Sequence, residues 1–206
     1  GLGDVYKRQG HGTHCAGVIS AVSDNNKGIC GISNAKLMAL KVFNSAGTSY
    51  DSAIIAAFNY IYKAQTLGAN IAAINCSWGG GGSSSTSMKT LINQIGQNGS
   101  LFLFAAGNDG ENHDNAISDG CPYDLDSPYV VTVGASTRTD KKASFSDYGN
   151  KTVHLFAPGR NIFSTINSGI FYPSGYTDSM RSSRCSYFTS FDSNDCLLYT
   201  SDAADE

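Results

Sequence analysis

Short apolar runs alternate along the chain with longer segments in which apolar residues recur at helical spacing. The helical spacing predicts helices over 11–22, 48–68 and 87–99. The apolar runs predict buried strands over 36–43, 70–78, 100–108 and 129–136. Strands that alternate with helices are typical of α/β proteins, so we predict a doubly wound, mostly parallel sheet covered on both faces, in three layers.

Two of the predicted strands end in stretches rich in glycine. The strand 70–78 leads into "CSWGGGG" (76–82), and the strand 100–108 ends in "AAGNDG" (105–110). In doubly wound sheets, ligands bind outside the carboxyl ends of the strands, so we expect a site at these two ends. No Lys-Ser or Lys-Thr pair follows glycines 79–82, which argues against a phosphate-binding loop and against a nucleotide-binding domain.

The two ends of the chain are interpreted as foreign to the protein. Codons can be chosen for residues 4–9 ("DVYKRQ") whose reverse complement, read one base in, encodes residues 196–201 ("CLLYTS"). Such an inverted pair resembles translated sequencing-adapter DNA. We therefore expect residues 1–9 and 196–206 to be non-native, and a native N-terminal portion to be missing before residue 10.

The net charge and the length of the apolar runs argue against some classes of partner. The net charge is −3 without a basic stripe, so composition gives no support for a nucleic-acid or anionic-membrane partner. No apolar run approaches the ~18 residues that a membrane-spanning helix needs.

Cys15 and Cys76 lie in predicted apolar elements and are expected to be buried thiols, whereas Cys30 and Cys121 can pair or stay reduced. The cysteines do not form a CxxC pair, so the sequence does not indicate a structural zinc site.

An ordered set of motifs runs through the middle of the chain. In order they are "GHGTHCAG" (10–17), "LMALKVF" (37–43), "NCSWGG" (75–80), "LFLFAAGNDG" (101–110), "SFSDYGN" (144–150) and "FAPGRNIFST" (156–165). Each motif alone is weak, but with the ordered set the chain resembles the subtilisin-like serine proteases (peptidase family S8) over residues 10–180. The resemblance implies an incomplete subtilisin-like domain from a serine endopeptidase with a Ser/His/Asp triad.

His11 and Asn108 take catalytic roles in this resemblance. By itself, His11 is a histidine at a glycine-flanked helix start, and Asn108 is a turn residue with a positive φ. The resemblance implies that His11 is the general base and that the side-chain amide of Asn108 donates to the oxyanion of the attacked carbonyl. His14 is expected to be structural.

The resemblance also assigns substrate binding to the two strand ends. One end is implied to pair with an extended peptide, and the other to form a wall of the pocket for the residue before the scissile bond. Without the resemblance, both are simply strand ends with tight turns. The residues concerned are Ser77, Trp78 and Gly79, and Ala105, Ala106 and Gly107.

Two members of the triad depart from the family pattern. The family order is Asp, His, Ser, so the aspartate would precede His11 and is not in this chain. The nucleophile segment Gly-Thr-Ser-Met-Ala-x-Pro-His is matched only by Ser179-Met180. Codons can be chosen for the residues after Met180 that encode Ala-Pro-His in a shifted reading frame. We interpret Ser179 as the candidate nucleophile, with a surface serine as the alternative, and residues 181–195 as a frameshifted tail. The chain as written is expected to be inactive.

The resemblance implies no cofactor for catalysis. The segment "SDNNKGI" (23–29) resembles a loop that binds structural calcium in some members of the family, and a solvated turn is the alternative.

Expected partners are polypeptide substrates in extended conformation, with no nucleic acid and no membrane. We expect a monomer, and the resemblance implies that it is secreted or extracellular. A catalytically dead, peptide-binding subtilase-like domain is the alternative function.

Overall fold

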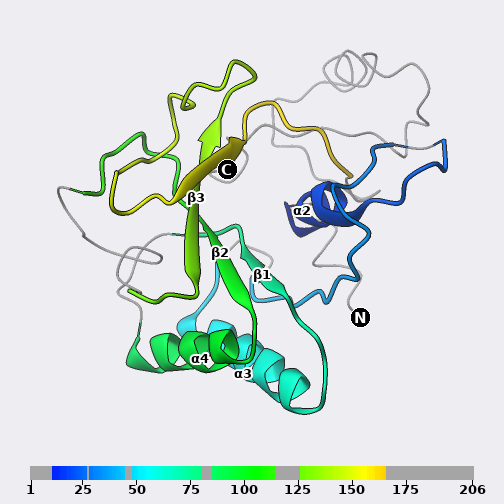
Figure 1. Cartoon of the computed structure of the whole chain (residues 1–206), viewed down its shortest axis with the longest axis vertical. Helices are drawn as coiled ribbons and strands as arrows, with labels where there is room; N and C mark the ends of the chain where they lie inside the picture. Colours follow the sequence, from blue (N-terminus) through cyan, green and yellow to red (C-terminus); the bar gives the residue numbers. More distant parts are fainter. Residues whose placement is uncertain (1–10, 27, 45–47, 80–84, 115–125, 166–206) are drawn as a thin grey trace. The chain divides into compact units, whose positions relative to one another are not determined.

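The structure is a computed structural model, and it describes residues 11–26, 28–44, 48–79, 85–114 and 126–165 (Figure 1). The chain divides into two compact units, Gly1–Thr48 with Asn161–Glu206 and Ser49–Arg160.

The larger unit is built on a four-stranded parallel sheet in the order β1-β2-β3-β4. In register, Cys76 of β1 lies beside Phe104 of β2, which lies beside Thr132 of β3. Three of these strands confirm predicted ones, with shorter bounds, whereas the fourth was not predicted. The strands are β1 (Ala73–Cys76), β2 (Leu101–Ala105), β3 (Val130–Ser136) and β4 (Leu155–Pro158).

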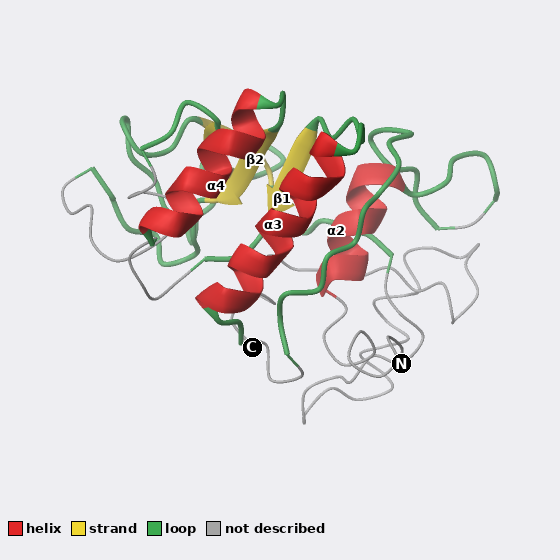
Figure 2. Cartoon of the chain, turned by 90° about the horizontal axis from the view of Figure 1, so that it is seen from below, coloured by secondary structure: helices red, strands yellow, loops and turns green. Residues whose placement is uncertain are grey.

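Two helices cover one face of this sheet, α3 (Asp51–Thr66) and α4 (Thr86–Gln97) (Figure 2). Phe58 of α3 packs edge-on against Phe102, with ring centroids 5.1 Å apart. The amphipathic α4 buries Met88, Leu91, Ile92 and Ile95. Both helices confirm the predicted ones, and their buried apolar side chains form the core of the unit.

The opposite face of the sheet is less covered within the described chain. Along β2, Phe102 and Phe104 are buried beneath the helices, whereas Leu101, which points the other way, is 45% exposed. The described elements of this unit therefore form two of the three predicted layers.

At the amino end of β2, a buried serine joins three segments of the larger unit. The Ser100 hydroxyl donates to the Ile71 carbonyl and accepts from Gln65 Nε2 at 2.8 Å. Gln65 Nε2 also donates to the Ile95 carbonyl at 3.2 Å. These contacts tie the end of α3 to the end of α4 and to the start of β2.

Close packing at the end of α4 depends on Gly96. A Cβ atom built on Gly96 would lie 2.0 Å from Cγ of Tyr129, the residue before β3. Gly96 is buried, so the absence of a side chain lets the Tyr129 ring contact the helix backbone.

The smaller unit contains α2 (His11–Ser20), which confirms the predicted helix. Its Gly17 packs against the segment before residue 166, because a Cβ atom there would lie 2.2 Å from Thr165 Oγ1. The hydroxyls of Ser164 and Thr165 donate to the carbonyls of His14 and Thr13, at 2.5 and 2.8 Å. His14 is buried, as expected of a structural residue.

The prediction of a buried strand over 36–43 is wrong for this structure. The segment is not a strand, and Leu37 and Met38 are 48% and 47% exposed. A strand forms only where a neighbouring strand satisfies its backbone hydrogen bonds, and the described residues of the smaller unit contain no strand.

Cys76 is buried in β1, as predicted, whereas Cys15 is only half-buried, because it lies on a helix that is partly exposed in its own unit. Within the described ranges, no helix combines the length and the hydropathy needed to cross a membrane.

Candidate active site

The structure brings the two predicted substrate-binding stretches to one edge of the sheet. Because β1 and β2 are parallel neighbours with Cys76 beside Phe104, the residues that follow both strands leave the sheet at the same end (Figure 1). The Trp78 ring packs edge-on against Phe104, with centroids 5.4 Å apart. Asn75 Nδ2 donates to Ser77 Oγ at 2.8 Å, which fixes the start of this stretch.

Asn108 follows directly on the second stretch. Ala106 is buried and its N–H donates to the Val133 carbonyl at 2.9 Å, so Ala106 is still held by β3. The chain then turns at Gly107, which has φ +115°, a value that favours glycine. The positive φ expected of Asn108 as a turn residue is therefore found on Gly107 instead. Asn108 is half-buried just beyond this turn.

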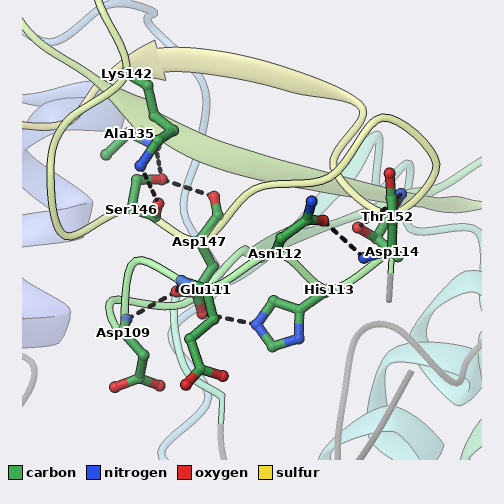
Figure 3. Close-up of polar contacts among 10 residues, drawn as sticks. All are labelled: Asp109, Glu111, Asn112, His113, Asp114, Ala135, Lys142, Ser146, Asp147 and Thr152. Carbon is green, nitrogen blue, oxygen red and sulfur yellow. Dashed lines mark hydrogen bonds and ion pairs between the residues drawn. The ribbon is translucent and has the colours of Figure 1, made fainter. Parts of the chain in front are cut away.

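The loop after Gly107 is held by a carboxylate that sequence reasoning missed. Asp147 Oδ1 accepts the N–H groups of Asp109 and Glu111 at 2.8 and 3.0 Å, and Oδ2 lies 3.0 Å from His113 Nε2 (Figure 3). The Asp147 N–H donates to the Gly107 carbonyl at 3.1 Å.

A second carboxylate holds the other end of the same segment. Asp114 accepts the N–H groups of Asn150, Lys151 and Thr152 at 2.6, 2.9 and 3.2 Å, and the Thr152 hydroxyl at 3.1 Å. Burial acts to raise the pKa of Asp114, but these hydrogen bonds to the ionised form outweigh it, and the pKa is lowered. Asp114 therefore stays ionised at neutral pH.

His11 belongs to the smaller unit, where it is the first residue of α2 and is half-buried. Its Nε2 lies 3.9 Å from Cys15 Sγ, one helical turn further on. The hydrogen bond with Cys15 raises the pKa of His11, burial lowers it, and the charge interaction with Cys15 raises it again, so that the pKa is raised overall. Ser179 lies outside the described residues.

The sequence carried a partial signal for the missed residues. Asp147 lies in "SFSDYGN", a motif that contributed to the family resemblance but had no role assigned to it. Nothing in the sequence links Asp147 to Asp109 or Glu111, which are separated from it by 38 and 36 positions. These contacts form only when the segments after β2 and β3 leave the sheet side by side.

A model of the subtilase family, peptidase family S8, matches residues 3–201. The chain therefore belongs to the subtilase family. The matched range includes parts of both ends that we interpret as non-native, and that interpretation stays a prediction.

Similar proteins are proteases that are longer than this chain. An extracellular protease of Xanthomonas campestris pv. campestris is 37% identical over 168 residues, which are 79% of this chain and 28% of that protein. Subtilisin DY of Bacillus licheniformis is 37% identical over 173 residues, which are 82% of this chain and 59% of that protein.

The structural comparison supports the predicted fold. A solved protease from Pseudoalteromonas arctica superposes with a TM-score of 0.66 at 31% identity, over 82% of this chain and 54% of that one. The subtilisin-like α/β fold is thus confirmed. The chain spans between 28% and 59% of the length of these three proteins.

Proposed function

We propose that the protein to which this chain belongs is a serine endopeptidase of the subtilisin type. The observation that carries the proposal is the position of Asn108. In a chain of the subtilase family, it follows Gly107 at the carboxyl end of β2, beside the end of β1 that carries Ser77 and Trp78. An extended polypeptide that pairs with the residues after β1 would present a carbonyl to this end of the sheet.

In the proposed reaction, the serine hydroxyl attacks the carbonyl carbon of the scissile peptide bond, and His11 accepts the hydroxyl proton. The carbonyl oxygen becomes an oxyanion, to which the Asn108 side-chain amide donates a hydrogen bond. His11 then returns the proton to the leaving amine as the C–N bond breaks, and water hydrolyses the resulting acyl-enzyme. Ser179 is our candidate for the nucleophile, and an aspartate before His11 would orient the imidazole.

We propose no catalytic metal. The loop 23–29 was a candidate for structural calcium, which takes about six to eight oxygen ligands. Its described residues supply one carboxylate, Asp24, and no group of three His, Cys, Asp or Glu that could hold a metal ion occurs among the described residues. The side-chain amides of Asn25 and Asn26 and the backbone carbonyls of the loop offer further oxygen atoms, so a structural calcium ion at this loop stays a proposal.

The test uses the complete domain, in which the native sequence replaces residues 1–9 and 181–206 that we interpret as non-native. A fluorophosphonate probe is expected to label one serine in that protein, and peptide substrates are expected to be cleaved. His11→Ala is expected to abolish both. For Asn108→Ala we expect kcat to fall ~10²–10³-fold, a magnitude known from the equivalent loss in a subtilisin. A correctly folded domain without labelling or cleavage would contradict the proposal and favour the peptide-binding alternative.

We further propose that the protein is secreted and acts as a monomer. The Xanthomonas relative and a relative from Dichelobacter nodosus are named extracellular proteases. Recovery of the native protein in the cell fraction alone would contradict secretion, and a dimer mass in light scattering would contradict the monomer.

A further inference from the structure

Both peptide groups that flank Asn108 are bound by one residue. The carbonyl of Gly107, which belongs to the peptide group before Asn108, accepts the Asp147 N–H at 3.1 Å. The N–H of Asp109, which belongs to the peptide group after Asn108, donates to Asp147 Oδ1 at 2.8 Å. Two fixed peptide planes leave Asn108 little freedom in its backbone torsions, and so they set the direction in which its side chain leaves the loop.

The Asp147 carboxylate also occupies the place where residue 107 would carry a side chain. A Cβ atom on Gly107 would lie 2.1 Å from Asp147 Oδ2. This distance is well below van der Waals contact, so the carboxylate approaches the turn only because residue 107 is glycine.

The partners of the carboxylate oxygens all come from this loop. Oδ1 accepts from Asp109 and from Glu111, and Oδ2 faces His113 Nε2. Asp147 is only 2% exposed, and a buried carboxylate is tolerated only when such partners compensate for the lost hydration. The loop and the carboxylate therefore stabilise each other.

Asp147 is itself fixed to the sheet through its neighbour Ser146, which is fully buried. Ser146 Oγ accepts the N–H of Ala135 in β3 at 2.8 Å and donates to the Asp147 carbonyl at 3.0 Å (Figure 3). Lys142 Nζ donates to the Ser146 carbonyl at 2.9 Å. A continuous path thus runs from β3 through Ser146 and Asp147 to both sides of Asn108.

We propose that Asp147 is a positioning residue for catalysis, which holds the side-chain amide of Asn108 where the oxyanion forms. The inference rests on the proposed function, because Asn108 must be the oxyanion donor. Asp147 acts through Asn108 and does not itself touch substrate. Positioning of this kind matters because a misplacement of about 1 Å at a reacting centre can lower the rate ~10²-fold.

The experiment compares Asp147→Ala and Asp147→Asn in the complete domain. Asp147→Ala removes both acceptor oxygens, and we expect kcat to fall about 10-fold to 100-fold with KM little changed. Asp147→Asn keeps one oxygen for the two N–H groups, and we expect most of kcat to return. Concentrations of active enzyme are set by fluorophosphonate titration, so that misfolded protein does not enter kcat.

A double-mutant cycle separates positioning from general destabilisation. If Asp147 acts through Asn108, then Asp147→Ala has little further effect on kcat in the Asn108→Ala background. Asp114→Asn is the matched control, since Asp114 is also a carboxylate that accepts backbone N–H groups but does not contact the peptide groups around Asn108. We expect Asp114→Asn to lower the Tm and leave kcat unchanged.

Amide hydrogen exchange adds a readout that does not require activity. The N–H groups of Asp109 and Glu111 are expected to be protected in the wild type and exposed in Asp147→Ala.

Suppose that the wild type is active. If Asp147→Ala then leaves kcat unchanged, or lowers kcat equally with and without the Asn108 side chain, the positioning role alone is overturned. If Asp147→Ala does not fold, an Asp147→Asn variant that lowers kcat equally with and without the Asn108 side chain would overturn it. A protected loop in a folded but inactive wild type would overturn the proposed function, and the positioning role with it.

Discussion

The two ends of β2 are each held by a buried polar side chain, but the two side chains hold different things. At the amino end, Ser100 joins the start of β2 to Ile71 and Gln65. At the carboxyl end, Asp147 joins the loop after β2 to Ser146 and so to β3. Ser100 thus connects elements of the core, whereas Asp147 connects the core to the residue that we propose as the oxyanion donor. Buried hydrogen bonds of similar geometry therefore join elements of the core at one end of β2, and at the other end they fix the loop that carries Asn108.

Among variants that alter the packing at the two ends of β2, the largest effect is expected from Gly107→Ala. The new methyl group would lie 2.1 Å from Asp147 Oδ2, and residue 107 would keep a φ of +115° that alanine rarely adopts. Relieving this contact requires a movement of about 1 Å or more, so we expect a ~10²-fold loss of kcat, measured by steady-state kinetics of the complete domain. A kcat within twofold of the wild type would show that the loop tolerates displacement, and it would contradict a role of the carboxyl end of β2 in activity.

Ser100→Ala tests the other end of the strand. It leaves the Ile71 carbonyl and Gln65 without their buried hydroxyl partner, so we expect the free energy of unfolding to fall by ~1–3 kcal/mol in denaturant titrations. The kcat per active site should not change, because Ser100 lies at the amino end of β2. A loss of kcat comparable to that of Asp147→Ala would contradict the division between the two ends.

Gly96→Ala tests a contact that involves packing and no hydrogen bond. Like Ser100→Ala, it is expected to change the stability and leave kcat unchanged. Alanine is the better helix former by about 1 kcal/mol, but its Cβ would lie 2.0 Å from Tyr129 Cγ, close to the tyrosine backbone. Overpacking costs about 1–3 kcal/mol, so a net loss of about 1 kcal/mol in the free energy of unfolding is expected, with kcat unchanged. If the contact with the Tyr129 ring is the cause, Gly96→Ala should cost less in a Tyr129→Ala background, where Cγ and Cδ2 are gone, than in the wild type. A Gly96→Ala variant that is more stable than the wild type would show that α4 can shift away from Tyr129 without loss of stability.

The sequence predicted the strands and helices of the larger unit because their signals are local. Phe102 and Phe104 lie in a continuous apolar run, and the buried residues of α4 recur at helical spacing. Residues 36–43 show the limit of this reasoning, since an apolar run specifies a strand only when a partner strand is present. The strand Leu155–Pro158 was missed because its four residues include a proline and give too short a pattern.

The candidate site was predictable in part, because only some of its residues lie in local sequence motifs. Asn108 and His11 lie in contiguous motifs, so a resemblance along the chain is enough to assign them roles, and these roles stay predictions. Asp147 acts through partners more than thirty positions away, and its burial follows from the packing of two loops. Such a role becomes visible only when the fold places the two loops together.

The smallest effect is expected in the smaller unit, where Cys15 contacts His11 and neither end of β2 is involved. The hydrogen bond with Cys15 raises the pKa of His11 and burial opposes it, so Cys15→Ala is expected to lower that pKa. A general base works when unprotonated, and the acid limb of kcat/KM reports its pKa in the free enzyme. With a lower pKa, His11 stays unprotonated to lower pH, so the acid limb of Cys15→Ala should move to lower pH while the plateau and the exchange of the Asp109 amide stay unchanged. Cys15→Ser, which retains a hydrogen-bonding group, should fall between the two. An acid limb that stays in place or moves to higher pH would show that Cys15 does not set the protonation of the base.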